Sequence, residues 1–167
     1  MHLCPCGSTI NHIDCCGSYI GGQSTPKTPE ALMRSRYTAY SMANIDYIKK
    51  TMKGKALLNF SDLEATLWAK RVVWLGLKIV KPLKEASNEH QGFVEFVVNY
   101  LDGQMLKTIH EISEFQCING HWFYIDGQHI NDVNPKKSLS RNAPCPCGSN
   151  KKFKNCHAPN DSRPIVK

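Results

Sequence analysis

A cysteine pattern that occurs twice, once near each end, limits what this chain can fold into more than any other feature. Each copy reads Cys-Pro-Cys-Gly-Ser and then, after a short gap, continues to Cys-Cys in front and Cys-His behind. A constant shift of 141 residues maps the first four positions onto the second four. Terminal segments this short have no core in which to bury thiols, so the repeat favours metal binding over unligated cysteines at chance spacing. The candidate ligands are Cys4, Cys6, Cys15 and Cys16 in front, and Cys145, Cys147, Cys156 and His157 behind.

The spacing within each group argues against disulfide bonds. Cys4 and Cys6 are separated by one residue, and Cys15 and Cys16 are adjacent, so pairing within these groups would strain the chain. In a reducing compartment such clusters more often hold a metal ion. Four ligands complete a tetrahedron and leave no open position for catalysis. We therefore expect two structural metal sites, with zinc favoured and iron as the alternative.

Length and composition indicate a soluble protein with one main domain. The chain has 167 residues, of which 41% are hydrophobic. No apolar run approaches the roughly 20 residues that a membrane helix needs, and the first residues lack the charged and apolar regions of a signal peptide. We predict a cytoplasmic protein without membrane insertion.

The first part of the main domain has helical periodicity. Thr28 is a capping residue and Pro29 suits the first helical position, and an apolar stripe then recurs at helical spacing to about Met52. This pattern predicts one helix over residues 28–52. A capping box of Ser61 and Glu64 predicts a second helix over residues 61–70.

After residue 70 the apolar period changes from helical spacing to two. Asp-Gly and Asn-Gly dipeptides, which are typical of tight hairpin turns, separate the alternating runs. Helices followed by an antiparallel meander of at least four strands indicate an α+β domain. The alternating runs cover residues 73–79, 94–100, 109–115 and 122–126, and the aromatic residues expected to be mostly buried are Trp74, Phe96, Phe115 and Trp122.

The rear segment resembles a known motif. Residues 141–157 read Arg-Asn-Ala-Pro-Cys-Pro-Cys-Gly-Ser-Asn-Lys-Lys-Phe-Lys-Asn-Cys-His, which is similar to the SEC-C motif. That motif is the zinc-binding tail of the preprotein translocase motor SecA, where it binds the export chaperone SecB. The resemblance implies that the rear segment binds zinc and contacts another protein.

The order of parts over nearly the whole chain resembles the uncharacterised YchJ family. The resemblance is carried by the front cysteine pattern and by Met-Arg-Ser-Arg-Tyr at 33–37, Trp-Leu-Gly-Leu at 74–77 and Trp-Phe-Tyr-Ile-Asp-Gly at 122–127. It implies an NTF2-like middle domain, in which a curved antiparallel sheet wraps around helices and leaves a pocket in its cone. The expected parts are a front metal knuckle (1–20), the NTF2-like domain (28–130), a polar linker (131–143) and a rear SEC-C knuckle (144–160).

The positive charge is concentrated behind the middle domain. The formal net charge is +7, and eight of the 21 lysines and arginines follow residue 134. Lys151, Lys152 and Lys154 lie inside the rear metal loop, whereas residues 9–14 of the front loop contain neither lysine nor arginine. We predict that the rear knuckle docks on an acidic protein surface of a chaperone, a translocation component or the ribosome. A solvated basic tail is the plainer interpretation, and nucleic-acid binding is a third, weakened by the lack of interleaved aromatic residues other than Phe153.

Side chains on two strand faces and on the first helix are candidates for a pocket in the cone. If these faces point inward, they place a few polar groups in an aromatic wall, where a small molecule could bind. The alternative is an ordinary amphipathic sheet with its polar side chains in solvent. We find no nucleophile, base and acid at informative spacing and no phosphate loop, so the sequence does not predict an enzyme, although a receptor or enzyme acting through this pocket stays an alternative function. The candidates are Arg34, Arg36, Glu111, Ser113, Trp122 and Tyr124.

Overall fold

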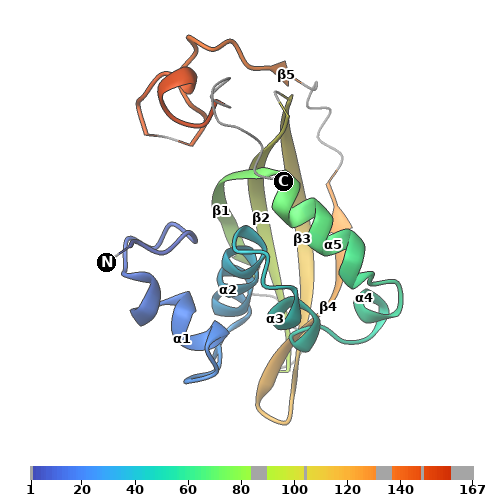
Figure 1. The fold of residues 1–167 in the computed structure, drawn as a ribbon. Coiled ribbons are helices and arrows are strands. Elements are labelled where there is room, and N and C mark those ends of the chain that lie inside the picture. The colour runs from blue at the N-terminus through green and yellow to red at the C-terminus, as the bar shows by residue number, and fades with distance from the viewer. Residues whose placement is uncertain (1, 84–89, 104, 131–136, 148, 159–167) are drawn as a thin grey trace.

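The computed structural model describes residues 2–83, 90–103, 105–130, 137–147 and 149–158. Its helices are α1 (Cys16–Ile20), α2 (Pro29–Ser41), α3 (Ile45–Lys50), α4 (Lys55–Leu58) and α5 (Asp62–Arg71), with the short 3-10 helices η1 (His12–Asp14) and η2 (Phe153–Asn155). Its strands are β1 (Val73–Leu83), β2 (Gln91–Asp102), β3 (Met105–Ile118), β4 (His121–His129) and β5 (Lys137–Ser138). Helices α2 to α5 lie on one side of the sheet (Figure 1).

The sheet is the predicted antiparallel meander, in the order β1-β2-β3-β4. Asn119 and Gly120 form the turn between β3 and β4 and have φ values of 52° and 77°, as a tight hairpin with the twist of its strands requires. Strand β5 pairs with Met105 and Leu106 of β3, beyond the reach of β4. Part of the predicted linker therefore adds a fifth strand, which brings the rear knuckle back to the end of the sheet.

The core lies between the inner face of the sheet and α2. Every second residue of the middle of β2 is buried, as the alternation predicts. Of the four aromatic residues expected to be mostly buried, Phe96 and Phe115 are buried, but Trp74 and Trp122 are only partly buried. Each indole N–H donates to a backbone carbonyl, which holds these two rings at the edge of the core rather than inside it.

The single helix predicted over residues 28–52 is two helices. Helix α2 begins as expected, with the Thr28 side chain accepting from Ala31 N (3.1 Å), but it ends at Ser41. Ala43 has a φ of 53°, and Asn44 N donates back to the Ala39 carbonyl (2.8 Å), which is a Schellman-type end without its usual glycine. The Asn44 side chain then caps α3. The apolar stripe continues through this break, so periodicity alone could not reveal it.

A close contact between the start of α2 and strand β2 depends on Gly92. A Cβ atom at this position would overlap the Pro29 ring at the start of α2. Gly92→Ala should therefore destabilise the fold by about 1–3 kcal/mol in chemical denaturation, because Pro29 is fixed in the first turn and has little room to move. In the Pro29→Ala background the same substitution should cost much less. Equal costs in the two backgrounds would show that this contact does not limit the packing.

Candidate metal centres and central cavity

The two terminal knuckles, residues 2–16 in front and 143–157 behind, share one backbone design. Cys4 N donates to the Ile10 carbonyl and Cys145 N to the Lys151 carbonyl, both at 2.8 Å. The chain reverses in each at a non-glycine residue with positive φ, Thr9 (63°) in front and Asn150 (58°) behind. A 3-10 helix, η1 or η2, then leads to the second ligand pair. The sequence repeat is therefore a structural repeat.

The front ligands have distances that suit a tetrahedral ion. The Sγ atoms of Cys6 and Cys15 are 3.7 Å apart, and those of Cys15 and Cys16 are 3.9 Å apart. Metal–sulfur bonds of about 2.3 Å in a tetrahedron place the sulfurs about 3.8 Å apart. A disulfide would require about 2.05 Å. With Cys4, all four sulfurs lie within 4.8 Å of one another, so the front knuckle has the donor set and the space for a metal ion.

The rear knuckle offers three sulfurs and one nitrogen. The Sγ atoms of Cys147 and Cys156 are 3.5 Å apart, and His157 Nδ1 lies 3.3 Å from Cys145 Sγ and 3.1 Å from Cys156 Sγ. These four ligand atoms also lie within 4.8 Å of one another. Both donor sets therefore fit the metal binding that the sequence predicts.

A serine that follows the first two cysteines supports each cluster. Ser8 Oγ lies 3.2 Å from Cys15 Sγ, and Ser149 Oγ lies 3.2 Å from Cys156 Sγ. In front, a hydrogen bond from Cys16 lowers the pKa of the Cys6 thiol to about 4. A thiol with such a pKa is a thiolate at neutral pH, which is the form that binds a metal ion.

A comparable thiolate is available in the rear knuckle. Burial opposes ionisation there, but hydrogen bonds from the side chain and backbone of Ser149 lower the pKa of the Cys147 thiol to about 6. The two ends therefore share the backbone turn, the serine and an acidic thiol. They differ in what they pack against.

The front knuckle is part of the main core. Cys4, Cys6 and Cys16 are buried in one cluster with α2 and β2 residues. Arg34 Nη1 donates to the Cys6 carbonyl (3.0 Å), and Arg34 Nε pairs with Glu30 (2.8 Å). Arg34 was predicted to enter the pocket, and this is wrong, because residues two apart on a helix point in nearly opposite directions. Arg34 supports the knuckle, and Arg36 faces the other way.

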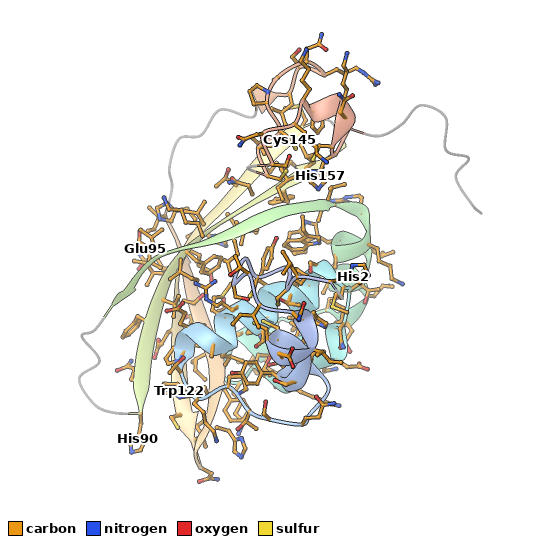
Figure 2. All side chains as sticks on the ribbon, turned by 90° about the vertical axis from the view of Figure 1, so that its left-hand side faces the viewer. His2, His90, Glu95, Trp122, Cys145 and His157 are labelled. Carbon is orange, nitrogen blue, oxygen red and sulfur yellow. The ribbon has the colours of Figure 1, made fainter. Side chains whose placement is uncertain are left out.

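The rear knuckle packs at one end of the sheet and has a small cluster of its own. Cys145 and Phe153 are buried there against Leu75 and Leu101. Figure 2 shows Cys145 and His157 at the end of the sheet opposite to Trp122, whereas His2 of the front knuckle lies beside the helices. The three predicted docking lysines are exposed, and no ion pair or hydrogen bond of their side chains occurs within the described part of the chain. These residues are Lys151, Lys152 and Lys154.

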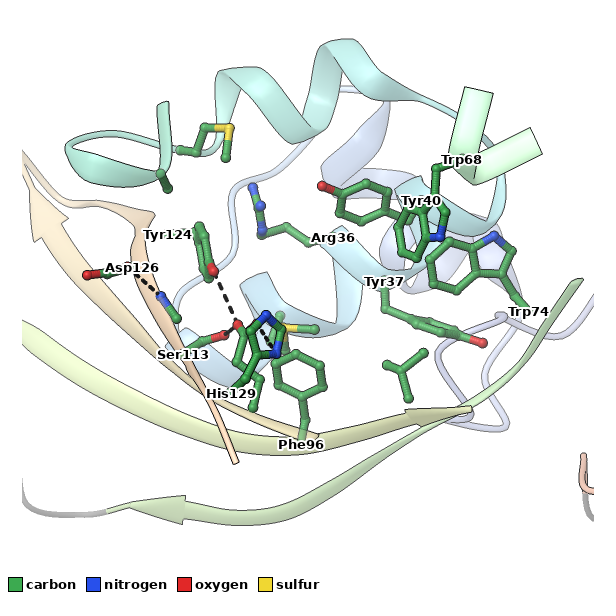
Figure 3. A pocket seen from close by; sticks show the side chains of 16 residues that line it. Arg36, Tyr37, Tyr40, Trp68, Trp74, Phe96, Ser113, Tyr124, Asp126 and His129 are labelled. Atoms are coloured by element: carbon green, nitrogen blue, oxygen red, sulfur yellow. Dashed lines mark hydrogen bonds and ion pairs between the residues drawn. The ribbon is translucent and has the colours of Figure 1, made fainter. Parts of the chain in front are cut away.

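A cavity of about 320 Å³ lies between α2, α5 and the inner face of the sheet (Figure 3). Its aromatic wall comes mainly from α2, α5 and β1, where the Trp68 and Trp74 rings meet edge to face with centroids 4.9 Å apart. Tyr40 stacks on Trp74 at 5.9 Å and meets Trp68 edge to face at 5.6 Å. The cavity therefore combines an aromatic side with a polar floor.

The polar floor contains two buried charged residues. Glu111 Oε1 accepts hydrogen bonds from Ser113 Oγ (2.6 Å) and from the Tyr124 hydroxyl (3.2 Å). Burial raises the pKa of Tyr124, so its hydroxyl stays protonated and able to donate. Arg36 Nη1 donates to the Ile48 carbonyl and to Thr51 Oγ1, both at 2.8 Å. The structure thus brings Arg36, Glu111, Ser113 and Tyr124 together around one cavity.

Trp122 was also predicted to line this pocket, but it lines a separate groove formed with the segment that follows α1. Its indole N–H donates to the Lys27 carbonyl (3.1 Å), which turns the ring away from the cavity floor. Gly127 and His129, which the sequence pattern did not indicate, also line the cavity. A bulge at Ile125 shifts the alternation of β4 by one residue, so the inward face continues from Tyr124 to these two residues, while Asp126 lies at the mouth of the cavity.

The aromatic wall was also missed, although part of its signal is visible. Tyr37 and Tyr40 are three residues apart on α2, a spacing that places both on one helix face. Trp68 on α5 comes from a separate element, and nothing in the sequence spacing relates it to them.

Within the described residues, no helix combines the length and apolar composition that crossing a bilayer requires.

These features define a protein with an NTF2-like α+β domain that carries a SEC-C-type knuckle with the donor set for a metal ion. The profile of the YchJ middle NTF2-like domain matches residues 28–127, and the SEC-C motif profile matches residues 141–159. UPF0225 proteins of Serratia proteamaculans and Photorhabdus laumondii are each 40% identical to the chain, over 92% of it and 96% and 97% of their own lengths. The chain belongs to this YchJ-like UPF0225 family.

Two solved structures of SEC-C motif proteins are similar to most of this chain. The solution structure of a Rhodopseudomonas palustris protein is 30% identical, with a TM-score of 0.69, over 78% of this chain and all of that one. The crystal structure of a Psychrobacter arcticus protein is 28% identical, with a TM-score of 0.68, over 93% of this chain and 95% of that one. The predicted NTF2-like α+β fold is therefore confirmed.

The packing of the two knuckles predicts unequal effects of losing a ligand. Metal analysis of the intact protein should find about two ions per chain, and Cys6→Ser and Cys147→Ser should each lose about one. Cys6→Ser should also lower the melting temperature of the middle domain by at least about 5 °C, because the front cysteines belong to its core. Cys147→Ser should lower it clearly less. Calorimetry showing equal shifts, or metal analysis showing no loss, would contradict this assignment.

Proposed function

We propose that this protein is a cytoplasmic zinc-binding docking protein whose rear knuckle binds an acidic surface on another protein. The observation that carries the proposal is the set of three exposed lysines, Lys151, Lys152 and Lys154, placed within one metal-ligand loop. A closed loop limits where the ammonium groups point, so less conformational entropy is lost when a partner binds. The resemblance of residues 141–157 to a translocase tail that binds a chaperone points to the same use.

Zinc is the ion we propose for both knuckles. Four-thiolate and three-thiolate-plus-histidine sets are typical of structural zinc sites, and iron is the alternative at thiolate-rich sites. In both donor sets the four protein ligands fill a tetrahedron, so the bound ion would hold the loop in shape and have no position for a substrate. The bound ion would thus act through folding, and the side chains of the loop would make the contact.

The front knuckle is not suited to the same partner. Its loop has no lysine or arginine, and the side chains it exposes include Leu3, Ile10 and Ile13. Its cysteines are buried against α2, so much of its surface is already used within the protein. We therefore assign docking on acidic proteins to the rear knuckle alone, with a chaperone, a translocation component or the ribosome as the candidates.

Replacing Lys151, Lys152 and Lys154 together with Ala should abolish most of the capture of acidic partner proteins by the immobilised, metal-loaded chain. The expected loss is about tenfold or more at low salt, and the remaining binding should depend less steeply on salt. The matched control replaces Lys27, Lys50 and Lys70, which are exposed on the middle domain, so that the net charge changes by the same amount. Quantitative mass spectrometry of the captured proteins, followed by titration of the purified partner, measures both effects.

Two results would contradict the docking proposal. If both triple variants weaken capture equally, only the net charge matters, and the basic loop is a solvated face. If neither does, the lysines are not part of the interface. Cys156→Ser should reproduce the loss seen with the rear lysine variant, because the lysines then remain but the loop that orients them is open.

A further inference from the structure

The free hydrogen-bond donors of Arg36 make the central cavity more than a packing defect. Within the described part of the chain, Nη1 is the one nitrogen of this buried side chain that donates to a protein group, to Ile48 and Thr51. Among the described residues, no buried side-chain nitrogen or oxygen lacks a partner, so Nε and Nη2 are not sealed within the core. The open space that Arg36 lines is this cavity, where its guanidinium lies over the Tyr124 ring at 4.6 Å. Nε and Nη2 have parallel N–H bonds and form the side-on fork that binds a carboxylate through two hydrogen bonds.

A buried negative charge shares the cavity with this cation. Glu111 is 8% exposed and Arg36 is 4% exposed, yet no ion pair joins them among the described residues. Glu111 Oε1 is occupied by Ser113 and Tyr124, whereas Oε2 has a weak contact with His129 Nδ1 at 3.8 Å. Two opposite charges that are buried but not paired each gain from a ligand that carries the complementary group. Such a ligand has an anionic group for Arg36 and a hydrogen-bond donor for Glu111.

The rest of the cavity selects for a small aromatic molecule. Its wall of Tyr40, Trp68 and Trp74 offers ring faces and edges at stacking distance. Its volume of about 320 Å³ is near the lower limit of ligand sites, which span about 300–1,000 Å³. At its mouth the side chains of Asp126 and His129 are 45% and 68% exposed, so a ligand can enter from solvent. A dianionic phosphate is disfavoured, because it would place a second negative charge close to Glu111.

We propose that the cavity binds a small aromatic carboxylate with a hydroxyl or amino group beside the carboxylate. The carboxylate would bind Arg36 Nε and Nη2, the neighbouring donor would bind Glu111, and the ring would pack against the aromatic wall. This function is independent of docking by the rear knuckle, because the two surfaces share no residue. It adds a ligand-binding role to the middle domain.

Three matched probes test the proposal on the full-length, metal-loaded protein. Phenyllactate has the ring, the carboxylate and the hydroxyl group, phenylpropionate lacks the hydroxyl, and phenylpropanediol lacks the carboxylate. Saturation-transfer NMR and calorimetry should give the lowest Kd for phenyllactate. Loss of the carboxylate should raise Kd by about tenfold or more, because it removes a charged two-point contact. Loss of the hydroxyl should raise Kd by a smaller factor.

Two variants locate the binding in this cavity. Arg36→Lys keeps the positive charge but loses the fork, so it should remove most of the difference between phenyllactate and phenylpropanediol. Ala56→Phe places a ring in the cavity from α4 and should abolish binding of all three probes. Lys50→Gln, on the exposed side of α3, should leave every Kd unchanged.

Three outcomes would overturn the proposal: phenylpropanediol binding as tightly as phenyllactate, Ala56→Phe binding all three probes normally, or no probe showing saturation transfer at millimolar concentration. If Arg36→Lys fails to fold, as NMR spectra would reveal, the probe series and Ala56→Phe still decide. None of these results depends on the lysines of the rear knuckle.

Discussion

The contact between the front knuckle and α2 determines the geometry of both the metal-ligand cluster and the cavity. Arg34 reaches the Cys6 carbonyl from one side of this helix, and Arg36 reaches the carbonyl at the end of α3 from the other. A metal ion that closes the front knuckle would therefore also hold the helix that carries the cavity's cation. The N-terminal knuckle is better understood as a part of the middle domain than as an attachment to it.

The rear knuckle has the same internal turn and hydrogen bonds as the front knuckle, but it packs against a different part of the middle domain. Its buried residues Cys145 and Phe153 contact Leu75, which lies at a bulge of β1, and Leu101 at the end of β2, while β5 ties the preceding segment to β3. This cluster is small and separate from the main core, so its metal-ligand loop can present exposed charges without disturbing the cavity. The same motif thus occurs once as part of the main core and once with an exposed basic loop.

Local patterns in the sequence were enough to predict the two clusters of candidate ligands and the meander. The ligands of each knuckle lie within 13 residues of one another, and the strands are joined by turns with their own signals, so short-range spacing fixes both. The features that the sequence did not predict depend on the backbone conformation of single residues. Ala43 ends a helix in a conformation that normally requires glycine, and the bulge at Ile125 changes which β4 side chains face inward. Neither event leaves a periodic signal.

The cavity floor shows why unpaired buried charge is informative. An ion pair between Arg36 and Glu111 would offset part of the cost of burying them, yet each has partners of its own, and the space beside them stays open. Gly127 contributes to this arrangement, because a side chain there would occupy the place of the Glu111 carboxylate and the Tyr124 hydroxyl. Selection for stability alone would favour a filled, apolar core at this position. An arrangement that keeps a cation, a carboxylate and empty space together is more readily explained by a ligand that completes it.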